Sequence, residues 1–272
     1  MRFSPNGERL LTRLREPVGL QLCSVPDATV LKVLYRGDFS DAIFSPDGQS
    51  VAVLFRAKSI DKVQLVDVAT GASTGPEMRL EPPGGKVTEM LFAPDGRRLV
   101  VTKDRLSHVF DVATGTQLAA LPLGSMAYGS TLSQNGKLLL TPCIDGLARL
   151  WDLETGKLRA VPTLQQASLA RALLSRDGTQ VVLFGLNGMV HRLAVDQGAA
   201  ESLVLPRQQP VLAATFARGA PHQVLRLLAQ RAEAIDVASG RAAAGGFAYP
   251  QAWTPLDHKI GHRPTTCRPS RK

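Results

Sequence analysis

Residues 132–156 read LSQNGKLLLTPCIDGLARLWDLETG, in which turns alternate with short strands. Asn135-Gly136 and Asp145-Gly146 are turn pairs, because glycine accepts a positive φ without steric cost and Asn and Asp tolerate it. The apolar run from Lys137 to Pro142 has the length of a strand, and the residues from Leu147 to Leu153 alternate between two faces. Two strands cannot bury both of their faces alone, so this unit requires neighbours.

Copies of the unit recur along the chain and are marked by two landmarks. The first is an aromatic or apolar residue followed by a turn: FSPNG at 3–7, FSPDG at 44–48, FAPDG at 92–96, LSQNG at 132–136, LSRDG at 174–178 and a degenerate FARGA at 216–220. The second is a strand that ends in a glycine turn: VQLVDVATG at 63–71, HVFDVATG at 108–115, ARLWDLETG at 148–156, VHRLAVDQG at 190–198 and EAIDVASG at 233–240. Because both landmarks advance with the same period of roughly 40–45 residues, the chain is a repeat protein.

Each period contains four strand-like runs, and no segment shows sustained helical periodicity. In the third copy the predicted strands are 86–92, 98–102, 106–111 and 117–121. Four antiparallel strands in a period of this length are typical of one blade of a β-propeller. The apolar runs at 51–55, 98–102, 137–141 and 180–184 are expected to be buried on both faces between neighbouring blades.

These landmarks resemble the WD-repeat (WD40) β-propeller family over about residues 3–248. The resemblance is carried by FSPDG between the first and second strands, by an Asp in the next hairpin, and by Trp151-Asp152 at the end of a third strand. It implies an all-β propeller of about six four-stranded blades, with repeats near 1–34, 39–80, 86–121, 127–161, 169–205 and 211–248. The repeat positions that it assigns a structural role are Asp47, Gly48, Asp61, Asp67, Gly71, Asp95, Gly96, Asp104, Asp111, Gly115, Gly136, Asp145, Trp151, Asp152, Gly156, Asp177, Gly178, Asp236 and Gly240.

The chain departs from the family pattern in its hydrogen-bonding residues. The Gly-His pair that precedes the first strand of a WD repeat is absent before Phe44, Phe92 and Leu132. The buried tetrad of His, Ser/Thr, Asp and Trp is therefore incomplete, and Thr102 with Asp104 and Trp151 with Asp145 are predicted to be fragments of it. We expect the blades to rely more on apolar packing.

The two ends of the repeat region also depart from the pattern. The first blade is predicted to be incomplete, because Met1 to Phe3 is all that remains of its first strand. Residues 248–254 would have to complete the ring. Residues 249–272 lose the repeat, carry five Lys or Arg against one Asp, and are predicted to be a basic, disordered tail. These features suggest a fragment of a longer polypeptide.

The composition indicates the class of protein and its expected location. The 272 residues are 44% hydrophobic and 20% charged, which is typical of a globular chain. No signal-peptide core and no apolar run of membrane-spanning length is present, so a cytoplasmic location is expected. Cys23, Cys143 and Cys267 are an odd, sparse set that argues against disulfides and against a zinc site.

Candidate chemical groups are few, and the structural interpretation is preferred for each. His258 and His262 lie four residues apart in the tail without an acidic ligand, so no metal or cofactor is expected. The tail cations and Trp253 are the only nucleic-acid feature, and binding of nucleic acid is not expected. Buried inert thiols are expected at Cys23 and Cys143, and strand-surface positions at His108 and His191. Four cations lie near predicted strand ends and are expected to line one rim of the propeller: Arg56, Lys103, Arg149 and Arg171.

The function predicted from these observations is a non-catalytic scaffold built on WD repeats, whose partner is another protein. One alternative is a sensory fragment of a larger bacterial protein, such as a WD-repeat serine/threonine kinase. Another alternative is a truncated reading frame without an independent function. A propeller enzyme would require convergent His, Cys or carboxylate side chains, and the sequence contains no such set.

Overall fold

The computed structural model describes residues 1–57, 60–160, 169–186, 189–195, 200–203, 211, 213–217, 220–228, 231–236, 239, 241 and 247–248. These residues form strands and turns and contain no helix, so the expected all-β class is confirmed. The strands assemble into six four-stranded antiparallel sheets, each built from consecutive strands. Accordingly, no described segment is a helix long and apolar enough to cross a membrane.

The sheets follow one another in the order of the sequence. The first contains β1 (Arg2–Phe3), β2 (Arg9–Arg15), β3 (Val18–Ser24) and β4 (Val30–Arg36), and the second contains β5 (Asp41–Phe44), β6 (Ser50–Ala57), β7 (Ile60–Asp67) and β8 (Ser73–Leu80). The third contains β9 (Val87–Phe92), β10 (Arg98–Lys103), β11 (Leu106–Asp111) and β12 (Gln117–Pro122), and the fourth contains β13 (Thr131–Leu132), β14 (Leu138–Pro142), β15 (Ala148–Asp152) and β16 (Lys157–Ala160). The fifth contains β17 (Leu169–Leu174), β18 (Gln180–Gly185), β19 (Val190–Ala194) and β20 (Ala200–Leu203), and the sixth contains β21 (Ala213–Ala217), β22 (Ala220–Leu227), β23 (Arg231–Asp236) and β24 (Phe247–Ala248).

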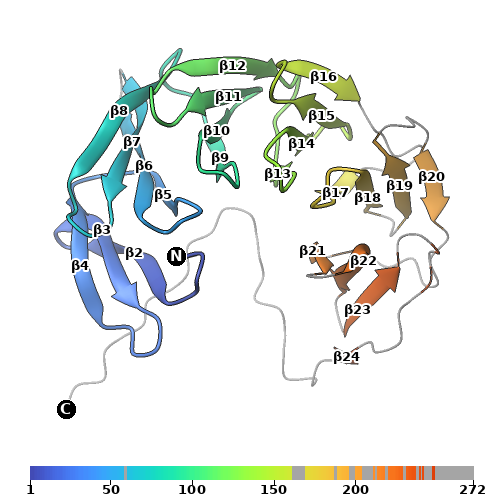
Figure 1. Ribbon diagram of the computed structural model, residues 1–272, viewed down its shortest axis with the longest axis horizontal. Helices are drawn as coiled ribbons and strands as arrows, with labels where there is room; N and C mark the ends of the chain where they lie inside the picture. Colours follow the sequence, from blue (N-terminus) through green and yellow to red (C-terminus); the bar gives the residue numbers. More distant parts are fainter. Residues whose placement is uncertain are drawn as a thin grey trace.

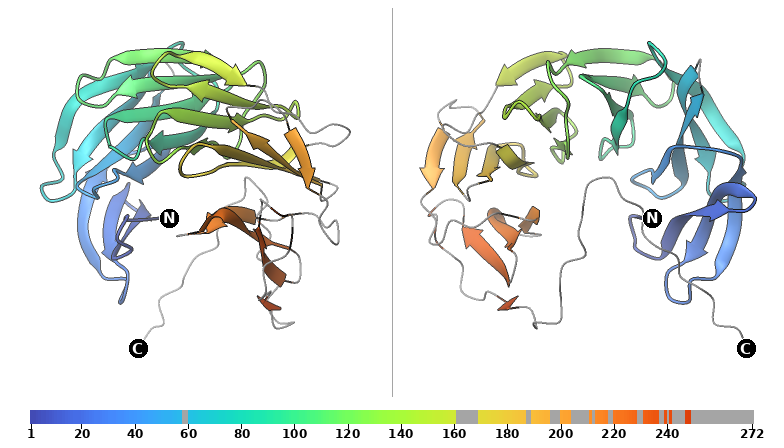
Figure 2. Two further views of the ribbon diagram at one scale, coloured as in Figure 1. Left: turned by 45° about the vertical axis from the view of Figure 1, so that its right-hand side comes forward. Right: turned by 180° about the vertical axis from the view of Figure 1, so that it is seen from behind.

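The six sheets lie around an arc, with the first and sixth sheets at its two ends (Figures 1 and 2). The first strand of each sheet faces the middle of the arc and the fourth strand lies at its periphery, as β9 and β12 show (Figure 1). Each sheet extends at most two residues beyond the predicted repeat that contains it. In the third sheet, every strand begins and ends within one residue of its predicted position.

The second strand of each internal sheet is buried on both faces. In β6, Val51 and Val53 pack against the first sheet, whereas Ala52 and Leu54 pack against the third. In β18, Val181 and Leu183 face the fourth sheet and Val182 faces the sixth. The described residues therefore form five separate apolar clusters, one between each pair of successive sheets, as the uniformly apolar runs predict.

The loops that join first to second strands and third to fourth strands lie at one end of the sheets, which we call the turn rim. In the second sheet the Ser45 hydroxyl donates to Asp47 Oδ1 at 2.5 Å and accepts from Ser50 N at 2.9 Å. The same three-residue arrangement recurs with Ser133 and with Ser175. The serine is thus a repeat position that the sequence analysis missed, although FSPDG and LSRDG share it.

The glycines and aspartates of the turn rim take the predicted turn geometry. Asp67 Oδ1 accepts from Thr70 N and Thr70 Oγ1 at 2.6 and 2.7 Å, and Asp111, Asp152 and Asp236 accept from equivalent backbone amides. Asp95 and Asp177 accept from the amides two residues later at 2.9 and 3.0 Å. Gly240 lies outside the described residues. The repeat glycines of these turns have φ between 67 and 77°: Gly48, Gly71, Gly96, Gly115, Gly136, Gly156 and Gly178.

The first sheet begins with the short strand that was predicted from Met1 to Phe3. Arg2 and Phe3 pair with Leu11 and Leu10, so this remnant is the first of four strands in the sheet. Its inner strand is only two residues long, but so is β13 in the middle of the chain. Ala248 pairs with Arg231 in the sixth sheet and not with the first sheet, while residues 249–272 lie outside the described part of the chain.

The third sheet has Ala93 where the second, fourth and fifth sheets carry Ser45, Ser133 and Ser175, and this provides a test of the turn hydrogen bonds. Ala93 is buried beside Gly136, and Ser133 is placed in the same way beside Gly178. We predict that Ala93→Ser raises the free energy of unfolding by about 0.5–1.5 kcal/mol, because the new hydroxyl can donate to Asp95. Ser133→Ala should lower it by a similar amount. Urea denaturation measures both values, and an unchanged or less stable Ala93→Ser variant would contradict this account.

Candidate functional site at the connection rim

The opposite end of the sheets carries the loops between second and third strands and the connections between successive sheets, which we call the connection rim. The β6–β7 hairpin places Arg56 directly opposite Asp61. The Asp61 side chain is only 1% exposed, and that of Lys103, which reaches it from β10 in the third sheet, is 5% exposed. A carboxylate and an ammonium group are thus buried together between two sheets.

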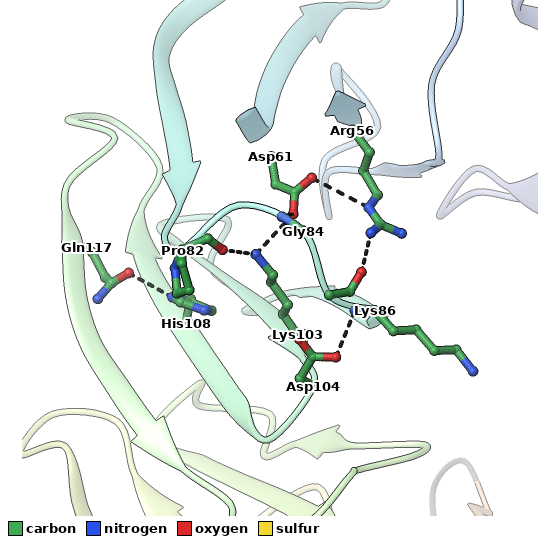
Figure 3. Close-up of polar contacts among 10 residues, drawn as sticks. Arg56, Asp61, Pro82, Gly84, Lys86, Lys103, Asp104, His108 and Gln117 are labelled. Carbon is green, nitrogen blue, oxygen red and sulfur yellow. Dashed lines mark hydrogen bonds and ion pairs between the residues drawn. The ribbon is translucent and has the colours of Figure 1, made fainter. Parts of the chain in front are cut away.

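Asp61 contacts three different segments of the chain (Figure 3). Its Oδ2 lies 3.0 Å from Lys103 Nζ and accepts from Gly84 N at 2.9 Å. Its Oδ1 lies 3.5 Å from Arg56 Nε, which is an ion-pair distance and too long for a good hydrogen bond. Because burial of an unpaired carboxylate is costly, these contacts explain how Asp61 is accommodated.

The same cations hold the connection between the second and third sheets, residues 81–86. Lys103 Nζ donates to the carbonyl oxygen of Pro82, and Arg56 Nη2 donates to that of Gly85. Asp104 then fixes the end of the connection, because its Oδ1 accepts from Lys86 N at 2.8 Å and its own amide donates to Lys86 O at 2.9 Å. Figure 3 shows these bonds around one loop. The loop is therefore held by side chains at both ends.

Gly85 is required by this arrangement. Its φ is +77°, and a Cβ atom at this residue would lie 1.8 Å from Asp104 Oδ2. Asp104 itself has a φ of 52°, in the left-handed region that Asp tolerates better than most residues. Gly85 and Asp104 are thus required together, whereas the sequence predicted Asp104 as a hairpin residue and a fragment of the WD tetrad.

His108 lies beside this cluster and is buried, so its expected position on a strand surface is wrong. It is 2% exposed, and its Nδ1 lies 2.8 Å from Gln117 Oε1. Burial lowers the pKa of His108 below its ordinary value of 6.5; the bond to Gln117 opposes the shift and the charge of Lys103 adds to it. His191 is also buried at 6% exposure, and burial lowers its pKa. Burial therefore favours the neutral form of both rings.

A pocket of about 220 Å³ opens between the connection and the β10–β11 hairpin. Its walls are residues 81–85 on one side and Lys103, Asp104, Arg105, Leu106 and His108 on the other. Leu106 and Arg105 belong to the hairpin tip, which the bonds of Asp104 hold against the connection. The pocket is thus bounded by the two segments that the buried ionic cluster fixes.

The predicted fragments of a WD tetrad do not form. Thr102 Oγ1 is bonded to Ser107 Oγ at 2.9 Å and not to Asp104. Asp145 makes two bonds to Arg149, at 3.3 and 2.8 Å, and Trp151 Nε1 has no hydrogen-bond partner among the described residues. Without the histidine of the family pattern, Asp145 pairs with the nearest cation, and Trp151 contributes through apolar packing between the third and fourth sheets.

The remaining candidates are distributed as follows. Cys23 and Cys143 are free and buried, as expected, and burial raises the pKa of the Cys143 thiol. Lys103 is buried at the connection rim in its ion pair with Asp61, and Arg149 is paired with Asp145. No group of three or more His, Cys, Asp or Glu side chains suited to a metal ion occurs in the described part of the chain. His258, His262, Cys267 and Trp253 lie outside the described residues.

The residues that hold the connection were only partly visible in the sequence. Asp61 was selected as a repeat position, but neither its burial nor the ion pair with Lys103 follows from the repeat. The sequence feature that could have indicated this loop is Gly84-Gly85-Lys86. It matches no phosphate-binding motif and lies between two predicted repeats. No protein-family model matches the chain, and no curated protein is significantly similar to it in sequence.

The buried ion pair can be tested by double mutation. We predict that Asp61→Ala lowers the free energy of unfolding by about 3–5 kcal/mol, because it leaves Lys103 buried without a counter-charge. Asp61→Ala combined with Lys103→Met should recover most of this loss. The control is Asp38→Ala, which removes an exposed ion pair with Arg13 and should cost less than about 1 kcal/mol. Equal losses for Asp61→Ala and Asp38→Ala would contradict the proposed role.

The neutral state of His108 predicts a pH dependence of stability. Because its folded pKa lies below 6.5, the unfolded chain takes up a proton at a higher pH than the folded chain does. The stability that depends on neutral His108 is therefore complete above pH 6.5 and is lost as the pH falls from 6.5 to the folded-state pKa. Thermal or urea unfolding of His108→Gln should show a shallower loss over this range than the unsubstituted protein. An identical slope in both proteins would show that His108 does not titrate between the two states.

Proposed function

We propose that the chain is a WD-repeat-like β-propeller of about six blades and that it acts as a non-catalytic scaffold for binding another protein. The fold supports this assignment through six successive four-stranded sheets, each with its first strand toward the middle of the arc. The recurring Asp and Gly turns of the turn rim also support it. In such a fold the loops at the ends of the sheets provide the binding surface.

The connection rim is the surface that we assign to partner binding, and the observation that carries the assignment is the fixed connection at residues 81–86. A loop that is ordered before binding pays less conformational entropy when a partner docks. Asp61 and Asp104 accept from Gly84 N and Lys86 N, while Lys103 and Arg56 donate to carbonyl oxygens of the same loop. Side chains far apart in the sequence thus define the shape of this rim.

Exposed apolar side chains support the same surface. Among the described loop residues, the exposed large hydrophobic side chains apart from Met1 are Ile144 and Leu186, at 67% and 59% exposure. They occupy equivalent hairpins of the fourth and fifth sheets, both at the connection rim. Apolar side chains held in the open by tight hairpins are typical anchors for a protein partner.

The arrangement of reactive groups favours binding over catalysis. His108 is committed to Gln117, and Cys143 is fully buried with a raised pKa. Neither has a nucleophile or base within hydrogen-bond reach in the described residues, whereas nucleophilic catalysis requires such a pair.

Photocrosslinking tests the assigned surface. A benzophenone amino acid at Ile144, introduced into the full chain in cells that produce it, should yield a discrete adduct with one other protein. The matched control at Ala113, an exposed residue of the turn rim, should not. Leu186→Asp should weaken the adduct at Ile144, because it replaces the exposed apolar side chain of the equivalent hairpin in the next sheet with a charge. No adduct, or the same adduct at both rims, would contradict the assignment.

A further inference from the structure

The pocket beside His108 is a side-chain-sized site that the scaffold function alone does not explain. Its volume of about 220 Å³ is below the range of roughly 300–1,000 Å³ that is usual for small-molecule and cofactor sites. It lies at the connection rim, between two segments that the Asp61 cluster holds in place. A pocket of this size on a protein-binding surface suits one inserted side chain of a partner.

One wall of the pocket offers a hydrogen-bond acceptor. With Gln117 Oε1 bonded to Nδ1, the ring proton lies on Nδ1, and Nε2 carries the free lone pair. Nε2 lies on the side of the ring away from Gln117, toward Lys103 (Figure 3), and the described residues provide no hydrogen bond to it. The ring is nonetheless almost completely buried, so a ligand that donates to Nε2 would satisfy a polar atom that has little access to water.

The pocket lining also contains two cationic side chains that can donate, beside the carboxylates of Asp104 and Glu81. Lys103 Nζ uses two of its three protons on Asp61 and Pro82 O, which leaves one. The exposed Arg105 guanidinium forms no ion pair with the described residues. A ligand that enters the pocket thus meets an acceptor at His108 and donors at Lys103 and Arg105.

The charges that line the pocket favour neither an anionic nor a cationic side chain as its ligand. Lys103 and Arg105 are balanced by Asp104 and Glu81 among the lining residues, so the pocket has no net charge that would favour either sign. A carboxylate offers only acceptors and would face the lone pair of Nε2, whereas an ammonium or guanidinium group offers only donors and would face Lys103 and Arg105. A carboxamide has an NH₂ group and a carbonyl oxygen and can satisfy both walls.

We propose that this pocket receives an Asn or Gln side chain of the bound partner, with the amide nitrogen donating to His108 Nε2 and the amide oxygen accepting from Lys103 or Arg105. This inference rests on the proposed scaffold function and specifies the recognition that one part of its surface performs. The same contacts disfavour a carboxylate, an ammonium or a guanidinium group in the pocket, because each of these groups would leave a buried polar atom of the pocket without a hydrogen-bond partner.

NMR titration of the full chain tests the proposal with three matched probes: the N-acetyl methylamides of glutamine, glutamate and lysine. The glutamine probe should cause saturable shifts of the Gly84, Gly85 and Leu106 amides and of His108 Nε2. The other two probes should bind about tenfold more weakly at pH 7.5. Equal binding of the glutamate or lysine probe, or shifts spread over the whole surface, would overturn the assignment.

Two variants link the signal to the pocket. Arg105→Ala removes an exposed donor and should weaken the glutamine probe severalfold without altering the fold, whereas Arg97→Ala, at an exposed cation of the turn rim, should have no effect. Unchanged binding by Arg105→Ala together with an unshifted His108 Nε2 resonance would refute the proposal. Because the adduct at Ile144 is measured independently, this failure would leave the scaffold function intact, whereas loss of that adduct alone would refute the scaffold function.

Discussion

The structure depends on one constraint, which is that the second strand of each internal sheet has two apolar faces and neither can remain in water. Val51 and Val53 on one face of β6, and Ala52 and Leu54 on the other, require a sheet on each side. The same condition in β10, β14 and β18 extends the stack from sheet to sheet. Repetition of this burial, at roughly 25 cal/mol for each Å² of apolar surface, is sufficient to order the arc without the hydrogen-bonded tetrad of the WD pattern.

Polar side chains buried between the sheets are exceptions to this rule, and they need partners. The turn rim uses local bonds, as between Ser45 and Asp47, which lie within one turn. At the connection rim the bonds join distant segments, since Asp61 of the second sheet pairs with Lys103 of the third. Local bonds shape each turn separately, whereas the bonds of Asp61 fix one sheet relative to the next and determine the surface between them.

The sequence predicted what depends on local pattern. Two landmarks with a common period located the sheets, and the strands of the third sheet are within one residue of prediction because apolar alternation and Gly turns define their ends. The site was less accessible, since Asp61, Lys103 and Gly84 are brought together only by packing of two sheets. His108 was misplaced for the same reason: a polar residue in a third strand shows by itself neither which neighbour covers it nor that Gln117 satisfies it.

Amide hydrogen exchange across the connection tests the central claim, that buried side chains hold this surface loop. The amides of Gly84 and Lys86 donate to Asp61 and Asp104, whereas the amide of Gly85 between them forms no hydrogen bond with the described residues. The account predicts slow exchange at Gly84 and Lys86, comparable with the adjacent strands, and fast exchange at Gly85. Equally fast exchange at all three amides would show that the loop is not held by the buried ionic cluster and would contradict the account.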